Sequence, residues 1–474
     1  MAEHPPGSPS DDDDDDRRPG QPNPFSGTPF EQIFGGLGGP GGPGGGDTGG
    51  LQAMFGQLQR MFAPHEGAVN WEYVRDLARQ VVAQQPDRSP DAADTGRVRD
   101  AARLAEHWLD QATEFPASSS TVVAWSRADW VENAMPAWER LVEPVAKSVV
   151  TAMADALPAE AKAMAGPMMG MLNQIGSAMF SQQIGQAVGG LAQEVVSATD
   201  IGIPVGDDHT PAIVISNAEE FGAGLGVDDD DVLLYLVLRE CAHQRLFSSA
   251  PWLKHYLFST IEEYGRGITI DTAKIENSIS QLDPTNMEAV QEALSGGLFD
   301  VEPTPAQQAA LTRLETALAL IEGWVDEVVG QSTAQVMPQA AQLREAVRRR
   351  RASGGPAEAT FAALVGLELR PRRLRDASAL WGALRASEDA KARDAVWSHP
   401  HLLPTSDDLD DPLGFAQRTQ EADDLDVDSP EFDAALSALL TDGAEPPAAA
   451  EAPSEESEEG DDNRPRPDPD PGQA

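Results

Sequence analysis

The sequence is short of several residue types on which common classes of protein depend. It contains one cysteine, Cys241, so no disulfide can form within the chain, and a reducing compartment such as the cytoplasm is expected. Only five lysines occur among 474 residues, and the formal net charge is −44. Binding a phosphate backbone needs concentrated positive charge, so nucleic acid is not expected as the main partner. The N-terminus also lacks the charged start and apolar stretch of a signal peptide.

Long stretches free of polar residues are missing as well. The most apolar long segment, 164–196, has too many amide side chains for a helix that faces lipid. These amides are Asn173, Gln174, Gln182, Gln183 and Gln186. The spacing of Gly185 and Gly189 would allow close helix packing either in a membrane or in a helical core. The amides favour the core, and no membrane span is expected.

Both ends of the chain are poor in residues that build a hydrophobic core. Residues 1–64 are dominated by Gly, Pro and Asp, and residues 406–474 by Asp, Glu, Pro and Ala. These ends carry −6 and −19 of the net charge. Such segments bury too little apolar surface to offset the entropy of ordering them. We therefore predict disordered ends around one folded domain at 65–405, with the acidic tail either solubilising or docking on a basic partner.

The central part shows mainly helical periodicity, as in Trp71–Val82, where apolar residues recur every three to four positions. Two short β-branched runs, Ile201–Val205 and Ala212–Ile215, are separated by turn residues and predict an antiparallel hairpin. The expected fold class is therefore mainly α, with one small antiparallel β element. A long helical stretch is expected from Pro305 to about Arg351, with a break at Met337-Pro338.

One predicted helix, at about 230–249, carries a polar motif inside an apolar run. The run Val232–Phe247 contains Arg239-Glu240-Cys241-Ala242-His243. A zinc-peptidase helix reads His-Glu-x-x-His, in which two imidazoles one turn apart bind the metal and the Glu acts as base. Glu240 and His243 stand at the matching positions, whereas Arg239 stands in place of the first histidine.

A second predicted helix, at about 306–330, carries a pair of acids. Glu322 and Asp326 are four residues apart and therefore share one helix face. In one large class of zinc peptidases, a Glu in such a pair supplies the third metal ligand, and the Asp orients a ligand histidine. The two helices would have to pack together for His243 and Glu322 to meet.

Together these motifs resemble the zincin-like metallopeptidases of the hydrolase type found in GC-rich bacteria. The resemblance spans about residues 67–390 and also rests on Leu238–Phe247, Pro251–Leu253, Gly267–Asp271, Glu322–Asp326 and Arg348–Arg375. It implies a zincin-like helical fold that hydrolyses a peptide or protein with zinc-activated water. By matching position, His243 and Glu322 would bind the zinc, Glu240 would be the general base, and Asp326 would orient a ligand.

The arginine at position 239 leaves two main functions open. A catalytic zinc takes three protein ligands, and a guanidinium supplies no lone pair. Two unit charges ~4 Å apart repel by about 4 kcal/mol at an effective dielectric constant near 20, and a dication would feel about twice that. Either the site is rearranged in a working peptidase, or Arg239 replaces the metal by pairing with Glu322 and Glu240. The second case would make the chain a pseudo-peptidase that binds or scaffolds a partner. A metal-free hydrolase using Glu240 is a third option.

Other candidate residues have weaker patterns. His255 does not have the spacing of a further ligand, and His209 lies in a turn expected to be exposed. Cys241 points away from His243 on a helix and is expected to be a buried apolar residue. The basic cluster Arg348–Arg351 is compatible with nucleic acid, an acidic partner or the chain's own acidic tail.

Overall fold

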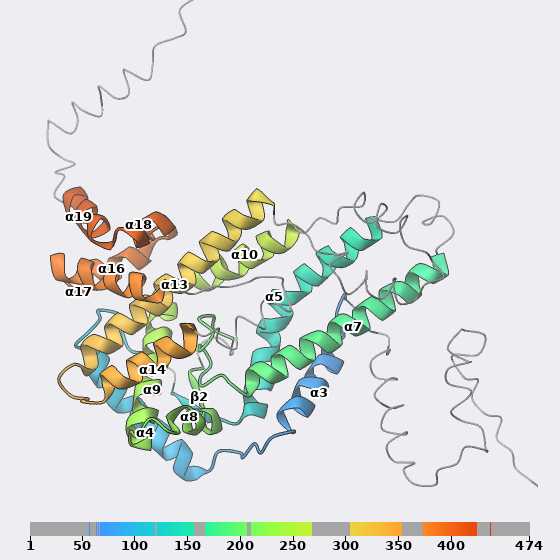
Figure 1. Ribbon diagram of the computed structural model, residues 1–474, viewed down its shortest axis with the longest axis horizontal. Coiled ribbons are helices and arrows are strands. Elements are labelled where there is room, and N and C mark those ends of the chain that lie inside the picture. Colours follow the sequence, from blue (N-terminus) through green and yellow to red (C-terminus); the bar gives the residue numbers. More distant parts are fainter. Residues whose placement is uncertain are drawn as a thin grey trace, which may run out of the picture. The chain divides into compact units, whose positions relative to one another are not determined.

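The computed structural model describes residues 67–118, 121–155, 166–205, 210–267, 304–352 and 373–423, with the single residues 56, 63, 65 and 437. The chain forms two units, Met1–Ala63 and Pro64–Ala474, and every element named below belongs to the second. The helices are α3 (Trp71–Val82), α4 (Ala92–Leu109), α5 (Arg127–Asp155), α7 (Gly166–Ala192), α8 (Ile215–Gly222), α9 (Asp229–Ser249), α10 (Trp252–Arg266), α13 (Pro305–Thr333), α14 (Ala340–Ala352), α16 (Leu374–Ser387), α17 (Ala390–Ala395), α18 (Ser406–Asp410) and α19 (Pro412–Asp423) (Figure 1). Two short 3-10 turns, Val396–Ser398 and Pro400–Leu402, follow α17.

Helices α9 and α13 are largely enclosed by other helices. Every residue of Val232–Phe247 in α9 is buried, and so is every residue of Ala317–Asp326 in α13. A helix that is buried on all sides must be surrounded by other helices. Helix α4 packs on α9, while α10 and α16 pack on α13 (Figure 1). Both polar motifs therefore lie in the hydrophobic interior.

The helix boundaries follow local sequence signals. Asp228 caps α9 by accepting a hydrogen bond from the backbone of Asp230. Thr304 and Gln307 form a reciprocal capping box at the start of α13. The break expected at Met337-Pro338 is confirmed, because α13 ends at Thr333 and α14 begins at Ala340.

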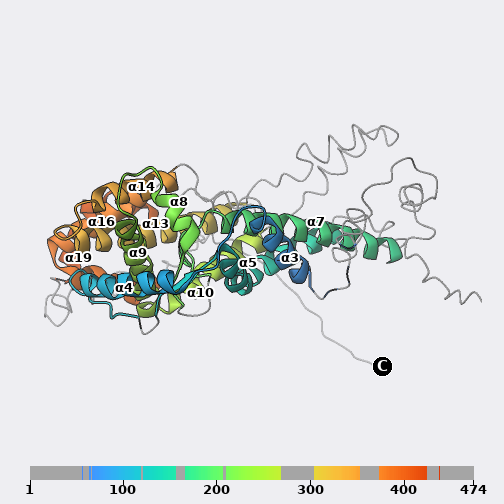
Figure 2. The same ribbon diagram turned by 90° about the horizontal axis from the view of Figure 1, so that it is seen from below.

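Helices α3, α5 and α7 lie side by side (Figures 1 and 2). A Cβ atom at Gly189 of α7 would lie 2.6 Å from the Cβ of Val81 in α3. The glycine pair in this segment therefore permits close packing in a helical core, as expected. Among the described helices, none is long and apolar enough to cross a bilayer.

The predicted β element is present, but its partner and direction were wrong. Strand β2 (Ala212–Val214) pairs in parallel with β1 (Val123–Trp125), from much earlier in the chain. The segment Ile201–Val205 forms turns instead, because Gly202 has φ +77° and Pro204 has no N–H to donate to a ladder. An isolated antiparallel bridge joins Ser197 to Ile213.

Regular structure continues past the boundary expected at residue 405. Thr405 and Asp408 form a capping box at the start of α18, and α19 extends to Asp423. Leu409 and Ala416 are buried in these two helices, which contact α16. Apolar spacing also predicts helices at Ile268–Ile279 and Phe361–Leu369, and both segments lie outside the described residues.

Candidate functional site

The candidate site lies where α9 and α13 cross in the interior. The Nε2 atom of His243 is 3.0 Å from Oε1 of Glu322, and both side chains are almost completely buried. The other ring nitrogen of His243, Nδ1, lies 2.8 Å from the backbone carbonyl of Arg239. The two residues singled out as metal ligands are therefore brought together, and both nitrogens of the ring face acceptor oxygens.

Arg239 forms a direct ion pair with the same carboxylate. Its Nη2 atom lies 2.7 Å from Oε2 of Glu322, and 7% of the arginine side chain is exposed. The expected pairing with Glu240 is not found in the described part of the chain, so Arg239 contacts only one of its two predicted partners. Its Nη1 atom is buried and has no hydrogen-bond partner among the described residues, and neither does the hydroxyl of Tyr235 one turn earlier.

A second guanidinium reaches Glu322 from α14. The Nη2 atom of Arg351 lies 2.8 Å from Oε1 of Glu322 and donates to the backbone carbonyl of Asp200 at 2.6 Å. Burial alone would raise the pKa of Glu322, but Arg351, His243 and Arg239 together hold it at about 2. Glu322 is therefore an ionised carboxylate with cationic donors on both oxygens.

Asp326, one turn along α13, is also bound by arginines. Arg344 and Arg348 of α14 each place Nη2 2.5 Å from Oδ2 of Asp326, and Ser378 of α16 donates to the same oxygen at 2.8 Å. Burial would raise the pKa of Asp326, and the two guanidiniums lower it to about 2. The residue that was expected to orient a metal ligand is thus part of an ion-pair cluster with α14.

The turn that follows Val196 lies against the same cluster. Asp200 accepts from Arg350 at 2.8 Å and from the backbone of Val196 at 2.9 Å. Burial opposes ionisation of Asp200, but Arg350 and Arg351 lower its pKa overall. A Cβ atom at Gly202, in the left-handed region at φ +77°, would lie 3.6 Å from Oε1 of Glu322. The turn therefore approaches Glu322 at a position that favours glycine.

Glu240 points to a different set of partners. Its Oε2 atom accepts hydrogen bonds from Thr199, at 2.5 Å from the hydroxyl and 3.3 Å from the backbone nitrogen. Its Oε1 atom accepts from the backbone of Ala212 at 3.4 Å and from Gln244 at 3.3 Å. This fully buried carboxylate joins α9 to β2 and to the turn over the site. The donors to Glu240 are thus different groups from those that bind Glu322.

The remaining sequence candidates lie away from this cluster or outside the described residues. His255 is exposed on α10. Cys241 is buried, and burial together with Glu106 raises the pKa of its thiol well above the usual value. His209 falls among residues that the structure does not describe.

The binding of Glu322 and Asp326 by arginines of α14 was not predicted from the sequence, although the spacing of these arginines indicated it. Arg344, Arg348 and Arg351 are separated by four and three residues and therefore share one helix face. That face matches the pair Glu322 and Asp326, which are likewise one turn apart on α13. The sequence left nucleic acid, an acidic partner and the chain's own acidic tail open as partners of this basic cluster, whereas Arg348 and Arg351 in fact pair with buried acids of α13.

The donor set does not fit a catalytic zinc. Such an ion needs three ligands with lone pairs directed at one point and a coordinated water. Among the candidate ligands that the structure describes, only His243 and Glu322 converge. The ring nitrogens of His243 face acceptors, and Arg239 and Arg351 can only donate. Within the described ranges, no group of three or more His, Cys, Asp or Glu side chains could hold a metal ion.

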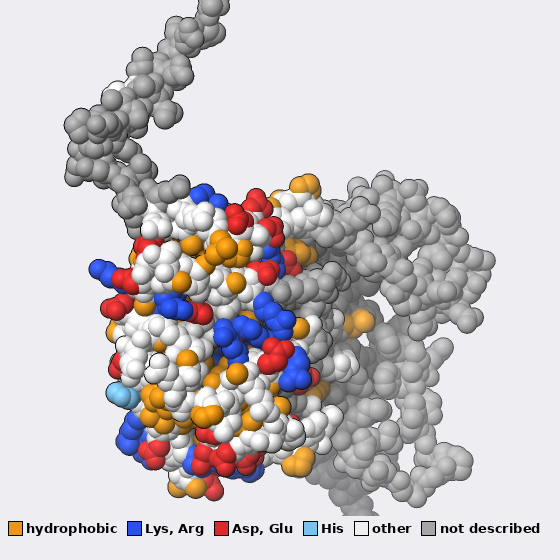
Figure 3. All heavy atoms as spheres, turned by 60° about the vertical axis from the view of Figure 1, so that its left-hand side comes forward, with side chains coloured by type: hydrophobic (Ala, Val, Ile, Leu, Met, Phe, Trp, Pro, Cys, Tyr) orange, Lys and Arg blue, Asp and Glu red, His pale blue; other side chains and the backbone are white. Residues whose placement is uncertain are grey.

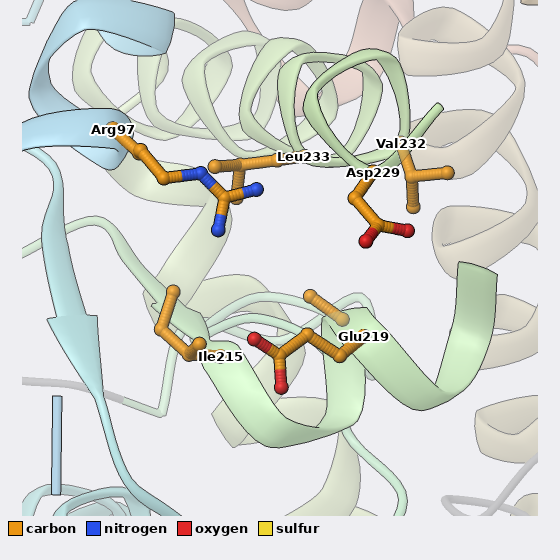
Figure 4. A pocket seen from close by; sticks show the side chains of 7 residues that line it. Arg97, Ile215, Glu219, Asp229, Val232 and Leu233 are labelled. Carbon is orange, nitrogen blue, oxygen red and sulfur yellow. The ribbon is translucent and has the colours of Figure 1, made fainter. Parts of the chain in front are cut away.

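A small hollow near the start of α9 is separate from the cluster. It has an empty volume of about 290 Å³, open to solvent, and its walls come from α4, α8 and the first turn of α9 (Figure 4). Its lining residues are Arg97, Ile215, Ala218, Glu219, Asp229, Val232 and Leu233. Val232 at the hollow lies seven positions before Arg239, a separation of about 10 Å along the helix axis. Arg97 also pairs with Asp230 at 2.8 Å, so the charges at its rim are partly neutralised.

Comparisons with known proteins give a family and a fold. A sequence model of the zincin-like metallopeptidase family matches residues 69–416. The structure is similar to a crystal structure from Chloroflexus aurantiacus, of a provisionally assigned hydrolase with a novel fold. The TM-score is 0.54 at 19% sequence identity, covering 74% of this chain and 99% of the other. No curated protein matches the sequence.

Proposed function

We propose that this chain, which belongs to the zincin-like metallopeptidase family, is a member that binds a polypeptide without hydrolysing it. The observation that carries the proposal is the buried ion pair of 2.7 Å between Arg239 and Glu322. It places a guanidinium on the carboxylate that would otherwise be a metal ligand. His243 completes the pairing from the other side of the carboxylate.

Among the residues that the structure describes, this arrangement leaves neither a metal site nor a free general base for peptide hydrolysis. Metal-assisted hydrolysis needs an ion that lowers the pKa of a bound water, and a base within hydrogen-bond reach of that water. The ligand set does not fit the ion. The oxygens of Glu240 accept hydrogen bonds from Thr199, Ala212 and Gln244, so this carboxylate serves as an anchor for the surrounding backbone.

The ion pairs also explain how such a buried polar site can be tolerated. An isolated buried carboxylate costs several kcal/mol, and the cost is recovered only when good ion pairs and hydrogen bonds satisfy it. Glu322 has Arg239, Arg351 and His243 around it, and Asp326 has Arg344, Arg348 and Ser378. The site thus acts as part of the folded core, while the family relationship supports a peptide or protein as the partner.

The rival function is a working zinc peptidase, and one observation favours it. His243 and Glu322 meet at 3.0 Å, as two ligands of a common ion would. For zinc to bind, however, the guanidiniums of both Arg239 and Arg351 would have to leave Glu322.

Metal analysis together with a peptidase assay separates the two functions. We expect protein purified without added zinc to contain far less than one zinc per chain, and to leave an unstructured protein such as casein uncut with or without zinc. The His243→Ala variant provides the matched control for metal content. Near-stoichiometric zinc that is lost in this variant, with cleavage that depends on the zinc, would overturn the proposal.

A further inference from the structure

We infer that Arg239 and Arg351 act as a pair, replacing with two guanidiniums the double positive charge of a divalent metal ion. This inference rests on the proposed function and deepens it by assigning a role to Arg351. The two arginines come from different helices, α9 and α14, and meet at one carboxylate. Arg239 holds Oε2 of Glu322 at 2.7 Å, and Arg351 holds Oε1 at 2.8 Å.

The burial of the three side chains makes the charge balance important. The exposed fractions are 7% for Arg239, 12% for Arg351 and 1% for Glu322. In such surroundings an unbalanced charge is costly, so each group depends on the others. A divalent ion bound by Glu322 would bring two positive charges to this point, and the two guanidiniums bring the same number. The carboxylate therefore remains neutralised without a metal.

Arg351 has its own attachment, independent of Arg239. Its Nη2 atom donates to the backbone carbonyl of Asp200 at 2.6 Å, and its neighbour Arg350 pairs with the Asp200 side chain at 2.8 Å. Two further arginines of α14, Arg344 and Arg348, hold the same helix to Asp326. Replacing Arg239 alone would consequently leave Arg351 at Glu322. Each of the two arginines on its own therefore keeps a metal ion away from Glu322.

The outer edges of the α14 arginines reach the surface. Between 21% and 28% of the side chains of Arg344, Arg348 and Arg350 is exposed, whereas that of Arg351 is 12% exposed. On one face of the molecule, Lys and Arg side chains gather near the middle with acidic side chains beside them (Figure 3). Arg349 is exposed on the same helix and donates to the backbone carbonyl of Glu345. It offers a matched control for removing a nearby positive charge.

The inference predicts which substitutions create zinc affinity. Zinc binding is measured by competition with a chromophoric chelator for R239H, R351M and the double variant R239H/R351M, with R239H/R349M as the control. We expect the double variant to bind zinc at least ~100-fold more tightly than either single variant, because a single remaining guanidinium still repels a dication at short range. The control should behave as R239H alone. Adding E322Q to the double variant should abolish the binding.

Two results would overturn the inference. One is R239H binding zinc as tightly as R239H/R351M, since Arg351 would then not close the position. The other is a folded double variant, verified by circular dichroism, that gains no zinc affinity. If the double variant does not fold, melting temperatures test the inference instead. E322Q should lower the melting temperature of the wild type by several degrees, and that of R351M by less. Equal losses would also overturn the inference.

Failure of the proposed function would be visible separately. Zinc bound by the wild-type chain, with cleavage of casein, would remove the non-hydrolytic function whatever the variants do. A zinc-binding double variant beside a wild type without zinc would support both. A wild type without zinc whose double variant is folded and also binds none would remove only the role assigned to Arg351.

Discussion

Arg239 of α9 and Glu322 of α13 form an ion pair of 2.7 Å, with less than a tenth of either side chain exposed. This contact joins two largely buried helices at the point where their polar motifs meet. The same carboxylate is shared with Arg351 and His243, so one acidic side chain links α9, α13 and α14. The arrangement of these three helices therefore depends on Glu322.

Replacing Glu322 with Gln is expected to destabilise the protein strongly. The change would leave Arg239 buried without its anionic partner and Arg351 with only the more distant Asp200, at 3.7 Å. Breaking a buried pair in this way costs roughly 3–5 kcal/mol. The free energy of unfolding, from urea denaturation, provides the measurement. Glu345→Gln is the matched control, because Glu345 pairs with Arg375 at the surface and should cost less than about 1 kcal/mol. Similar losses in both variants would contradict the importance of the buried cluster.

Stability should fall in acid through the carboxylates of this cluster. Glu322 and Asp326 have folded-state pKa values of about 2, below the ordinary values of 4.5 and 3.8. The unfolded chain consequently binds more protons in this range, and the stabilisation is present near neutral pH and lost as the pH falls from about 5 to 2. Each group should contribute about 2–3 kcal/mol at neutral pH.

Urea denaturation at a series of pH values tests this expectation. Because the chain has 78 acidic residues, the informative quantity is the difference between the wild type and Glu322→Gln. That difference should shrink as the pH is lowered. A difference that is constant from neutral pH to pH 3 would show that Glu322 is not the group that titrates.

Glu240 should behave as a structural anchor. Glu240→Gln would turn an amide N–H₂ group toward donors of Thr199 or Ala212, and we expect a loss of roughly 1–3 kcal/mol in the free energy of unfolding. Thr199→Val removes the hydroxyl and should produce part of the same loss, and the double variant should lose less than the sum because the two side chains share one hydrogen bond. Glu219→Gln, at an exposed ion pair with Arg88, is the control. Additive losses for Glu240 and Thr199 would argue against the anchor.

Truncations should locate the end of the folded unit. Removing residues 405–474 is expected to lower the melting temperature by several degrees, because Leu409 and Ala416 are buried in α18 and α19. Removing residues 424–474 should change it little. Thermal unfolding of the two truncated proteins compares them directly. If the longer truncation melts like the full chain, α18 and α19 contribute nothing to stability.

The helices that carry the site could be predicted from local signals. The expected ranges of about 230–249 and 306–330 correspond to α9 at Asp229–Ser249 and α13 at Pro305–Thr333. The acidic residues at the start of the first helix and the Thr304-Pro305 start of the second act through nearby backbone groups, so they can be recognised without the fold. Helical spacing also predicted that Glu322 and Asp326 share one face of their helix.

The partners of these side chains could not be predicted in the same way. Arg351 reaches Glu322, and Thr199 reaches Glu240, only because α14 and the turn after Val196 pack against α9 and α13. Local spacing says nothing about which distant segment supplies a partner. The predicted strand pairing was wrong for a similar reason. Local spacing did not show whether β2 would pair with Ile201–Val205 or with Val123–Trp125. The choice depended on Gly202 and Pro204 interrupting the nearer run.

The seclusion of Cys241 has a practical consequence. Cys241 is 1% exposed, and burial raises the pKa of its thiol well above the usual value, so the thiol should react slowly with alkylating reagents. The chain has no other native cysteine. A thiol introduced at an exposed position, such as that of Arg349, would therefore take up a spin label or fluorophore selectively. Distances from α14 to the rest of the protein could then be followed in solution without altering the native residue.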